Sequence, residues 1–477
     1  MFTLNEITRA FTGKNLFESD QLFTEAVVDS RLSAAGTLFI AIPGENTDGH
    51  KFVSSAFANG ARAALIQEEI EGDYIFVDLR EGTAADTIKS GTTNVEKPVC
   101  IRVENTIAAL QKIAAFHRTQ LPKMEVTGIT GSVGKTTTKE LMYDVISDHY
   151  RTLKTLGNKN NEIGLPMTLL RADENTEQAI LEMGFYVPGE IDQLCQIAKP
   201  SVGIITNVGM VHASRAGSRD VIAQGKSELI RALPDDGTAI LNYDDPYVRP
   251  MADLTKANIF YYGTDPAADL YAIDINSKGL EGIDFTLIHK GQKHPIHLPW
   301  IGRQSVMTAL RGTAFGLVKG LSWDEITERL RGSHNQLRLR LTRTFSGSML
   351  IDDSYNASPE STAAALSLLS EVNGRKTAVL GDMKELGQYE QKGHRMIGEK
   401  AAQICDKLIA VGPAMKITVD TAIENGMNPE SIQWFATSAE AADYLINHPS
   451  SKDEVLLVKG SLSMNMAHVV SKLEEKK

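Results

Sequence analysis

The chain has 477 residues, more than one hydrophobic core usually holds, so we expect about three domains. Its 60 acidic and 49 basic residues give a formal net charge of −11, which argues against the broad basic surface of a non-specific nucleic-acid binder. The three scattered cysteines are typical of a reducing cytoplasm and not of a disulfide scaffold. The sequence has no basic and apolar leader and no run of 18 apolar residues, so we expect a cytoplasmic protein without membrane insertion. The acidic charge predicts no nucleic-acid partner.

The first hundred residues mix short strands and helices. Residues 37–42 and 63–66 are apolar enough for strands, and residues 54–59 between them favour a helix. A longer helical pattern over residues 105–119 follows. This order predicts a small α/β domain over residues 1–101.

Residues 124–138 carry the most informative pattern in the chain. A short apolar strand runs into a glycine turn, and a helical pattern with Leu141, Met142, Val145 and Ile146 on one face follows. Strand, glycine loop and helix N-terminus together form a phosphate-binding arrangement, in which Lys135 reaches the β- and γ-phosphates and the Thr136 hydroxyl holds Mg²⁺. The strict P-loop pattern has a glycine where this chain has Ile129. The alternative is a glycine turn before an ordinary helix.

Strands and helices then alternate, which predicts a central domain over residues 102–332 built on a parallel sheet. The short apolar strands are expected at residues 179–184, 202–208 and 238–242. Alternating segments at residues 271–275, 283–288 and 294–298 predict an antiparallel addition, and residues 322–332 a closing helix.

Polar side chains follow two of these strands. Glu182 ends one strand and His212 comes just after the next. Because the carboxyl ends of parallel strands face the ligand crevice, both could join Thr136 around a Mg²⁺ ion. The alternatives are a charge at a strand edge and an ordinary loop histidine.

Two further segments are open to more than one interpretation. Lys226 lies in a helical stretch, where a solvated surface lysine is the simpler interpretation. The amide-rich segment with Asn158, Asn160 and Asn161 either binds peptide or carboxylate groups or caps the apolar helix that follows it.

The last third predicts a second, smaller α/β domain over residues 333–477. Its strands are expected at residues 349–352, 377–381, 408–411, 432–435 and 455–458. Asp353 follows a strand, where an acid can bind ribose hydroxyls, and Arg338 could reach the γ-phosphate. Asp352, Asn356 and Lys459 belong to the same group of candidates.

Several long motifs together resemble the Mur ligases, the ATP-dependent amide-forming enzymes of peptidoglycan synthesis. They include Asp29-Ser-Arg31, Gly157-Asn-Lys-Asn-Asn-Glu-Ile-Gly164, Glu182-Met-Gly184, Asp352-Asp-Ser-Tyr-Asn-Ala357, Gly381-Asp-Met-Lys-Glu-Leu-Gly387 and Val458-Lys-Gly-Ser461. The resemblance covers nearly the whole chain. It implies an N-terminal domain for a UDP-linked substrate, a central P-loop ATPase domain and a C-terminal Rossmann-like domain.

Within the family, the motifs are most similar to those of the member that adds D-alanyl-D-alanine to UDP-N-acetylmuramoyl-tripeptide, usually as a monomer. The resemblance implies that the ATP phosphates bind at the loop formed by Thr130, Gly131, Ser132, Val133, Gly134, Lys135, Thr136 and Thr137. It implies that two magnesium ions are held by Thr136, Glu182, His212 and Lys226. It also implies that Arg338 and Asp353 contact the nucleotide. It implies that Lys226 is a carbamate. It places the other substrates at Ser30, Arg31, Asn160, Asn161 and Asn356.

The chain departs from the family pattern where His and Asn usually lie by the adenine. Residues 302–305 are Gly-Arg-Gln-Ser in place of Gly-Arg-His-Asn, and Thr308 replaces a usual Asn. Two alternatives therefore stay open: a family ligase that adds a single amino acid, and a non-catalytic homologue that binds nucleotide-sugar peptides. The first has no support from an Asp-Asn-Pro-Arg signature, which the chain lacks.

Overall fold

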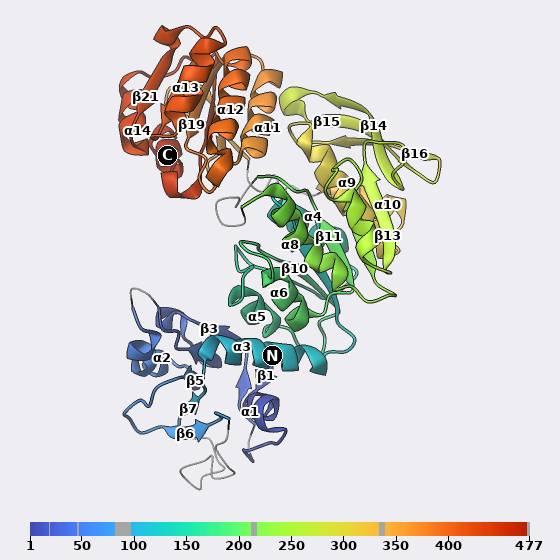
Figure 1. The fold of residues 1–477 in the computed structure, drawn as a ribbon, viewed down its shortest axis with the longest axis vertical. Helices are drawn as coiled ribbons and strands as arrows, with labels where there is room; N and C mark the ends of the chain where they lie inside the picture. Colours follow the sequence, from blue (N-terminus) through green and yellow to red (C-terminus); the bar gives the residue numbers. More distant parts are fainter. Residues whose placement is uncertain (19, 45–46, 82–96, 211–216, 333–338, 475–477) are drawn as a thin grey trace. The chain divides into compact units, whose positions relative to one another are not determined.

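The computed structural model describes the chain except residues 19, 45–46, 82–96, 211–216, 333–338 and 475–477 (Figure 1). The chain divides into two compact units. The first contains Met1–Ile129, Ser147–Gly184 and Gly189–Val202, and the second contains Thr130–Ile146, Phe185–Pro188 and Gly203–Lys477. Parallel sheets and crossover helices confirm the predicted α/β class. The domain boundaries at 101 and 332 stay a prediction.

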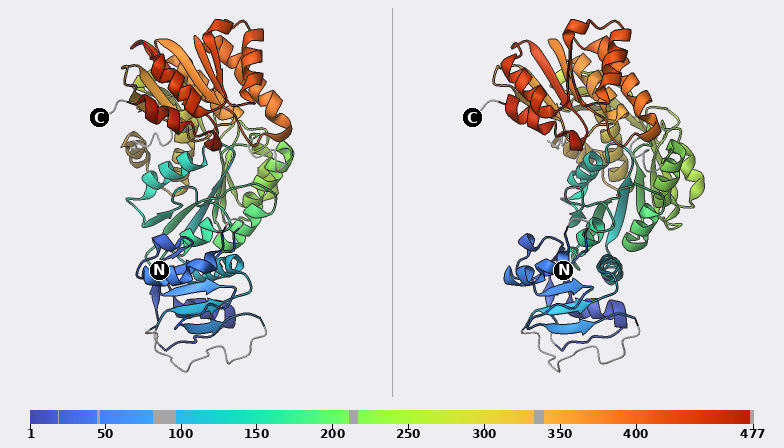
Figure 2. Two further views of the ribbon diagram at one scale, coloured as in Figure 1. Left: turned by 90° about the vertical axis from the view of Figure 1, so that its left-hand side faces the viewer. Right: turned by 60° about the vertical axis from the view of Figure 1, so that its left-hand side comes forward.

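A five-stranded parallel sheet forms the N-terminal part of the first unit (Figure 2). Its order is β3 (Glu25–Val27), β4 (Thr37–Ile40), β5 (Ala63–Ile66), β7 (Val99–Arg102) and β6 (Ile75–Asp78). Helix α2 (Val53–Ala58) packs on the face that includes Phe39, Ala64 and Cys100. Helix α3 (Thr106–Gln120) contacts β4 and β5.

Local sequence explains where these elements begin. The Asn105 side chain accepts from Ala108 N at 2.9 Å, so α3 begins one residue later than predicted because Asn105 is its N-cap. Helix α1 (Leu4–Thr12), which the sequence did not resolve, begins at a capping box formed by Thr3 and Glu6.

The largest sheet has nine strands in the order β16-β15-β14-β13-β12-β11-β8-β10-β9. Strands β8 (Glu125–Thr130), β10 (Gln178–Glu182) and β9 (Thr152–Lys154) pair in parallel. The other strands are β11 (Val202–Ile205), β12 (Thr238–Asn242), β13 (Asn258–Gly263), β14 (Leu270–Ser277), β15 (Ile283–His289) and β16 (Gln292–Leu298). The last three pair antiparallel, which confirms the predicted antiparallel addition.

The helices that accompany this sheet include α4 (Lys135–Ile146), α5 (Gly164–Leu169), α6 (Glu190–Ala198), α8 (Arg219–Arg231), α9 (Gln304–Val318) and α10 (Trp323–Gly332). The last of these confirms the closing helix predicted at residues 322–332.

The C-terminal sheet has helices on both faces (Figure 1). Its order is β17 (Arg340–Arg343), β18 (Met349–Asp353), β22 (Glu454–Lys459), β19 (Arg375–Gly381), β20 (Lys407–Val411) and β21 (Ile432–Phe435). Alternate strand residues face opposite sides. Ala378 and Leu380 pack with α11 (Pro359–Glu371), α12 (Glu390–Ile404) and α13 (Met415–Glu424), whereas Val379 packs with α14 (Ser438–Asn447) and α15 (Ala467–Leu473). This doubly wound arrangement confirms the predicted second α/β sheet.

Cys100, Cys195 and Cys405 are buried, and none of them is in a disulfide. Within the described part of the chain, no helix has both the length and the apolar character needed to cross a bilayer.

Candidate functional site

The glycine loop between β8 and α4 has a backbone that only glycine fits. Gly131 has φ 148° and Gly134 has φ 88°, both in the region that L side chains rarely adopt. A Cβ built on Gly131 would lie 1.8 Å from the Thr206 Oγ1. The loop therefore passes very close to the end of β11, and it leads directly into the N-terminus of α4.

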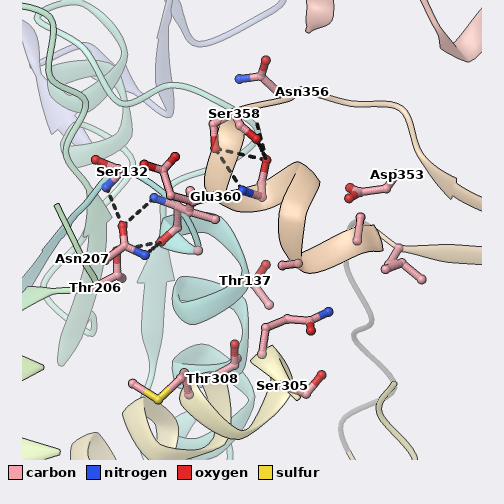
Figure 3. A pocket seen from close by; sticks show the side chains of 18 of the residues that line it. Ser132, Thr137, Thr206, Asn207, Ser305, Thr308, Asp353, Asn356, Ser358 and Glu360 are labelled. Atoms are coloured by element: carbon pink, nitrogen blue, oxygen red, sulfur yellow. Dashed lines mark hydrogen bonds between the residues drawn. The ribbon is translucent and has the colours of Figure 1, made fainter. Parts of the chain in front are cut away.

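The segment after β11 holds this loop from one side (Figure 3). The Asn207 Oδ1 accepts from Ser132 N at 3.2 Å and from Val133 N at 2.9 Å, and Asn207 Nδ2 donates to Val133 O at 3.3 Å. The Thr206 hydroxyl donates to the same Val133 carbonyl at 2.8 Å. Since these bonds fix two peptide units of the loop, its conformation is set before any ligand binds.

Lys135 and the threonines stand at the start of α4, as the sequence predicts. The Lys135 Nζ donates to Gly131 O at 2.7 Å, which holds the ammonium over the loop. Thr136 and Thr137 are half-buried in the first turn of the helix. The predicted Thr130 ends β8, where its carbonyl accepts from Thr206 N at 3.0 Å.

A cavity of about 380 Å³ lies in the second unit next to this loop. Ser132, Val133, Gly134 and Thr137 form part of its wall, and α9 and the segment after β18 form other parts. Figure 3 shows Thr137, Ser305, Thr308, Asp353 and Glu360 around this space. The cavity therefore joins the phosphate-loop motif to residues that the sequence assigned to two predicted domains.

The C-terminal candidates Asp353 and Asn356 both line the cavity. A nearly buried lysine connects them, because Lys459 Nζ donates to Asp353 Oδ2 at 2.7 Å and to Asn356 O at 2.8 Å. The ion pair holds the Asp353 carboxylate in one orientation. Such a carboxylate at a cavity wall can accept hydrogen bonds from the hydroxyl groups of a ligand.

Lys226 is not the solvated helix lysine that the simpler interpretation of the sequence predicted. It lies in α8 with 1% of its surface exposed, and its Nζ is 5.0 Å from the ring centroid of Phe185. Burial, together with the positive charge of Lys135, lowers the Lys226 pKa well below its usual value. The amine is therefore biased towards its neutral, nucleophilic form.

Glu182 and the amide-rich segment belong to the first unit. Glu182 is 3% exposed at the end of β10, and its Oε1 accepts from Asn160 Nδ2 at 3.0 Å. Asn161 Oδ1 accepts from Gly164 N at 2.9 Å, which caps the start of α5. The structure thus brings Asn160 to Glu182 and gives Asn161 the capping contact that was the alternative interpretation.

The N-terminal candidates differ in exposure. Ser30 is buried, and its carbonyl accepts from Asn59 Nδ2 at 2.9 Å. The Arg31 side chain is 87% exposed and pairs with Asp29 at 2.7 Å. Hydrogen bonds from Arg31 lower the pKa of Asp29 to about 2, so this pair stays ionised at neutral pH.

Two candidates, His212 and Arg338, lie outside the described residues. Among the residues that are described, no cluster of three or more His, Cys, Asp or Glu side chains could hold a metal ion.

The cavity residues that sequence reasoning missed include Thr206, Asn207, Arg311 and Glu360. The strand was predicted over residues 202–208, but β11 ends at Ile205 and Thr206 and Asn207 directly follow it. Their polar side chains at the end of an apolar segment were an available signal. Glu360 Oε1 accepts from Met210 N at 3.0 Å across a separation of 150 residues, and no local pattern indicates that contact.

Comparison with known proteins gives a consistent result over the chain. Three family models match: the Mur ligase family catalytic domain at residues 24–118, the Mur ligase middle domain at residues 129–316, and the Mur ligase glutamate ligase domain at residues 337–462. The Bacillus subtilis UDP-N-acetylmuramoyl-tripeptide–D-alanyl-D-alanine ligase is 34% identical over 94% of this chain and 92% of its own length. The Escherichia coli protein of the same name is 31% identical over 99% and 98%.

Solved structures agree with the sequence relatives. MurF from Acinetobacter baumannii matches with a TM-score of 0.84 and 29% identity over 100% of this chain and 99% of that one. MurF ligase from Thermotoga maritima, solved in complex with ADP, matches with a TM-score of 0.78 and 26% identity over 95% and 98%.

Proposed function

The chain belongs to the Mur ligase family, and from that premise we propose that it is the ATP-dependent ligase that joins D-alanyl-D-alanine to UDP-N-acetylmuramoyl-tripeptide. The observation that carries this function is the similarity, along almost the full length of both chains, to relatives named for that reaction. The cavity beside the phosphate loop supplies the nucleotide site that the reaction needs. We place the reaction in the cytoplasm, where thiols such as the three buried cysteines stay reduced.

In this proposal ATP binds at the loop of Gly131 and Gly134. The relative solved with ADP supports nucleotide use. The N-terminus of α4 and Lys135 provide donors for phosphate oxygens, whereas the amides of Ser132 and Val133 donate to Asn207. Val133 and Thr137 line the cavity where it meets this loop.

Magnesium completes this site in our proposal. Thr136 in the first turn of α4 would hold one ion with phosphate oxygens and water, and Mg²⁺ would supply Lewis-acid stabilisation of phosphate charge. Glu182, His212 and Lys226 are the proposed ligands of a second ion. The nearly complete burial of Glu182 favours a cationic partner, because a buried carboxylate is costly without one.

We further propose that Lys226 carries a carbamate. The neutral amine attacks CO₂, forms an N–C bond and releases one proton, which converts a buried base into an anion. Its lowered pKa supports the first step of this reaction at neutral pH. Incubation with ¹³C-labelled bicarbonate should give a carbamate NMR signal that a Lys226→Met variant lacks.

The reaction has two steps. The terminal carboxylate of the tripeptide attacks the γ-phosphorus of ATP, so that an acyl phosphate forms and ADP leaves. The amine of D-alanyl-D-alanine then attacks the acyl carbon, loses a proton and displaces phosphate, which leaves the new amide. Lys135 neutralises charge on the transferred phosphoryl group, and Arg338 is proposed to do the same.

The remaining contacts position the substrates. Asp353, which Lys459 orients, is proposed to accept hydrogen bonds from the ribose hydroxyls of ATP, with Asn356 beside it. Ser30 and Arg31 are proposed to hold the uridine nucleotide, and Asn160 and Asn161 the peptide.

Phosphate release tests the function directly. Purified protein with ATP, Mg²⁺ and UDP-N-acetylmuramoyl-tripeptide should release phosphate steadily only when D-alanyl-D-alanine is added. Turnover with a single amino acid in place of the dipeptide would instead identify another ligase of the family. No magnesium-dependent ATP turnover with all substrates present would favour the non-catalytic homologue.

A further inference from the structure

Arg311 is a buried cation in the cavity wall that the proposed reaction does not use. It lies in α9 with 5% of its surface exposed. Its Nη2 donates to Thr308 Oγ1 at 3.0 Å, whereas its buried Nε has no hydrogen-bond partner. Within the described part of the chain, no carboxylate lies within 4.0 Å of the Arg311 guanidinium.

The guanidinium lies directly against the phosphate loop. A Cβ built on Gly134 would be 3.2 Å from Arg311 Nη2 and 3.7 Å from its Cζ. Any side chain at position 134 would therefore press on the guanidinium as well as strain the backbone at φ 88°. Arg311 and the loop occupy adjoining space with no side chain between them.

A second contact connects Arg311 to the opposite side of the loop. The fully buried Tyr262 hydroxyl interacts with Arg311 and donates to Thr206 O at 3.2 Å. Thr206 in turn donates to Val133 O of the loop. Burial raises the pKa of Tyr262 to about 12, although the charge of Arg311 opposes that rise. Tyr262 is thus a neutral phenol at neutral pH and gives Arg311 no counter-charge.

A buried charge without an opposite charge is unfavourable by several kcal/mol, so such residues usually pair with a ligand or another ion. Lys459, a buried lysine of the same cavity, has Asp353 as its partner. Among the described residues Arg311 has no such partner, yet it lines the cavity beside the glycine loop.

We propose that Arg311 is a positioning residue of the nucleotide site: it supports the phosphate loop at Gly134 and supplies a fixed positive charge that the phosphates of a bound nucleotide neutralise. This inference rests on the proposed function of the loop. It also gives Thr308, which stands where the family usually has Asn, a role as the anchor of Arg311.

Removing the charge of Arg311 should maintain or raise the stability of the unliganded protein and should lower its affinity for ADP. Arg311→Met keeps an unbranched apolar stem and removes the charge, so the unliganded protein should be as stable as the wild type or more stable. The same variant should bind ADP about tenfold or more weakly, because a hydrogen bond or ion pair to a charged group is lost. A residue that serves only the fold would show the reverse pattern.

Calorimetric titration with ADP and with adenosine, combined with thermal unfolding, separates these cases. We expect Arg311→Met to lower ADP affinity, to leave adenosine affinity unchanged and to reduce the rise in unfolding midpoint that ADP causes. Arg311→Lys should keep more ADP affinity than Arg311→Met, and Thr308→Val should show an intermediate loss. The matched control is Arg231→Met, at an exposed arginine in the last turn of α8.

Three results would overturn the inference. They are wild-type ADP affinity in Arg311→Met, equal losses for ADP and adenosine, and an Arg311→Met protein that is destabilised or unfolded without ligand. If the wild-type protein itself bound no ADP, the proposed function of the loop would fail as well. Normal wild-type binding with unchanged variants would contradict the Arg311 inference alone.

Discussion

Replacing Asn207 by Ala should weaken ATP binding without unfolding the protein. Asn207 Oδ1 is the acceptor for Val133 N at 2.9 Å, so the substitution leaves this loop amide without its partner. Ser132 N keeps a main-chain acceptor, the Asn207 carbonyl, at 3.0 Å. One unsatisfied donor costs about 1–3 kcal/mol, which corresponds to about fivefold to 150-fold weaker ATP binding if the loop must recover its shape on binding.

A second substitution at the same position separates geometry from charge. Asn207→Asp keeps an acceptor for Val133 N, but it loses the donor to Val133 O and places a negative charge beside the phosphate loop. We therefore expect a larger loss of ATP affinity in Asn207→Asp than in Asn207→Ala. Calorimetric titration with ADP and a non-hydrolysable ATP analogue measures both, together with the KM for ATP.

The matched control is Asn258→Ala, because Asn258 is exposed at the start of β13 and bonds only to Gly237 O within the described contacts. That variant should bind ATP like the wild type. The reasoning fails if Asn207→Ala binds ATP with wild-type affinity, or if Asn207→Asp binds it more tightly than Asn207→Ala.

Three other substitutions test the site. Lys135→Ala should abolish phosphate release while the protein stays folded, and a variant that keeps most of its turnover number would refute the role of this lysine. Gly131→Ala should lose ATP binding and about 1–3 kcal/mol of stability, because its Cβ would meet Thr206 Oγ1 at 1.8 Å; Gly13→Ala, also at positive φ but with nothing within 4 Å, is the control in urea unfolding. Lys226→Met should lose activity and, at neutral pH, gain stability. Between the lowered pKa of Lys226 in the folded chain and its usual value of 10.5, the unfolded chain binds more protons than the folded chain. The free energy of unfolding of the wild type therefore rises with pH in that window. The variant should lack this pH dependence when its unfolding in urea is measured at several pH values.

Contiguous patterns were predictable from the sequence. The phosphate loop lies within eight consecutive residues, Thr130 to Thr137, so its glycines, lysine and threonines are recognisable without a structure. The short apolar strands were equally visible, and β5, β12 and β21 begin and end at the predicted residues. Such elements depend on local spacing of apolar residues, which the sequence states directly.

Burial of charged residues was not predictable in the same way. Lys226 has the same helical context as an exposed lysine, and only the packing of Phe185 against α8 removes it from water. Arg311 follows the phosphate loop by more than 170 residues, and its contact with Gly134 arises because α9 packs against α4. Both residues are recognised only when tertiary structure brings distant segments together.

The placement of Arg311 explains how an acidic chain can bind a polyphosphate. The net charge of −11 gives no general attraction for anions, so positive charge must be concentrated where the phosphates lie. Arg311 is 5% exposed and lies in the same unit as the loop, next to Gly134. Because salt screens buried charges much less than surface charges, its attraction for phosphate persists at physiological ionic strength. Lys226 does not add to this attraction, because its lowered pKa favours the neutral amine. A surface patch of positive charge would be weakened by salt and by the surrounding carboxylates, so the burial of Arg311 favours phosphate binding at this site.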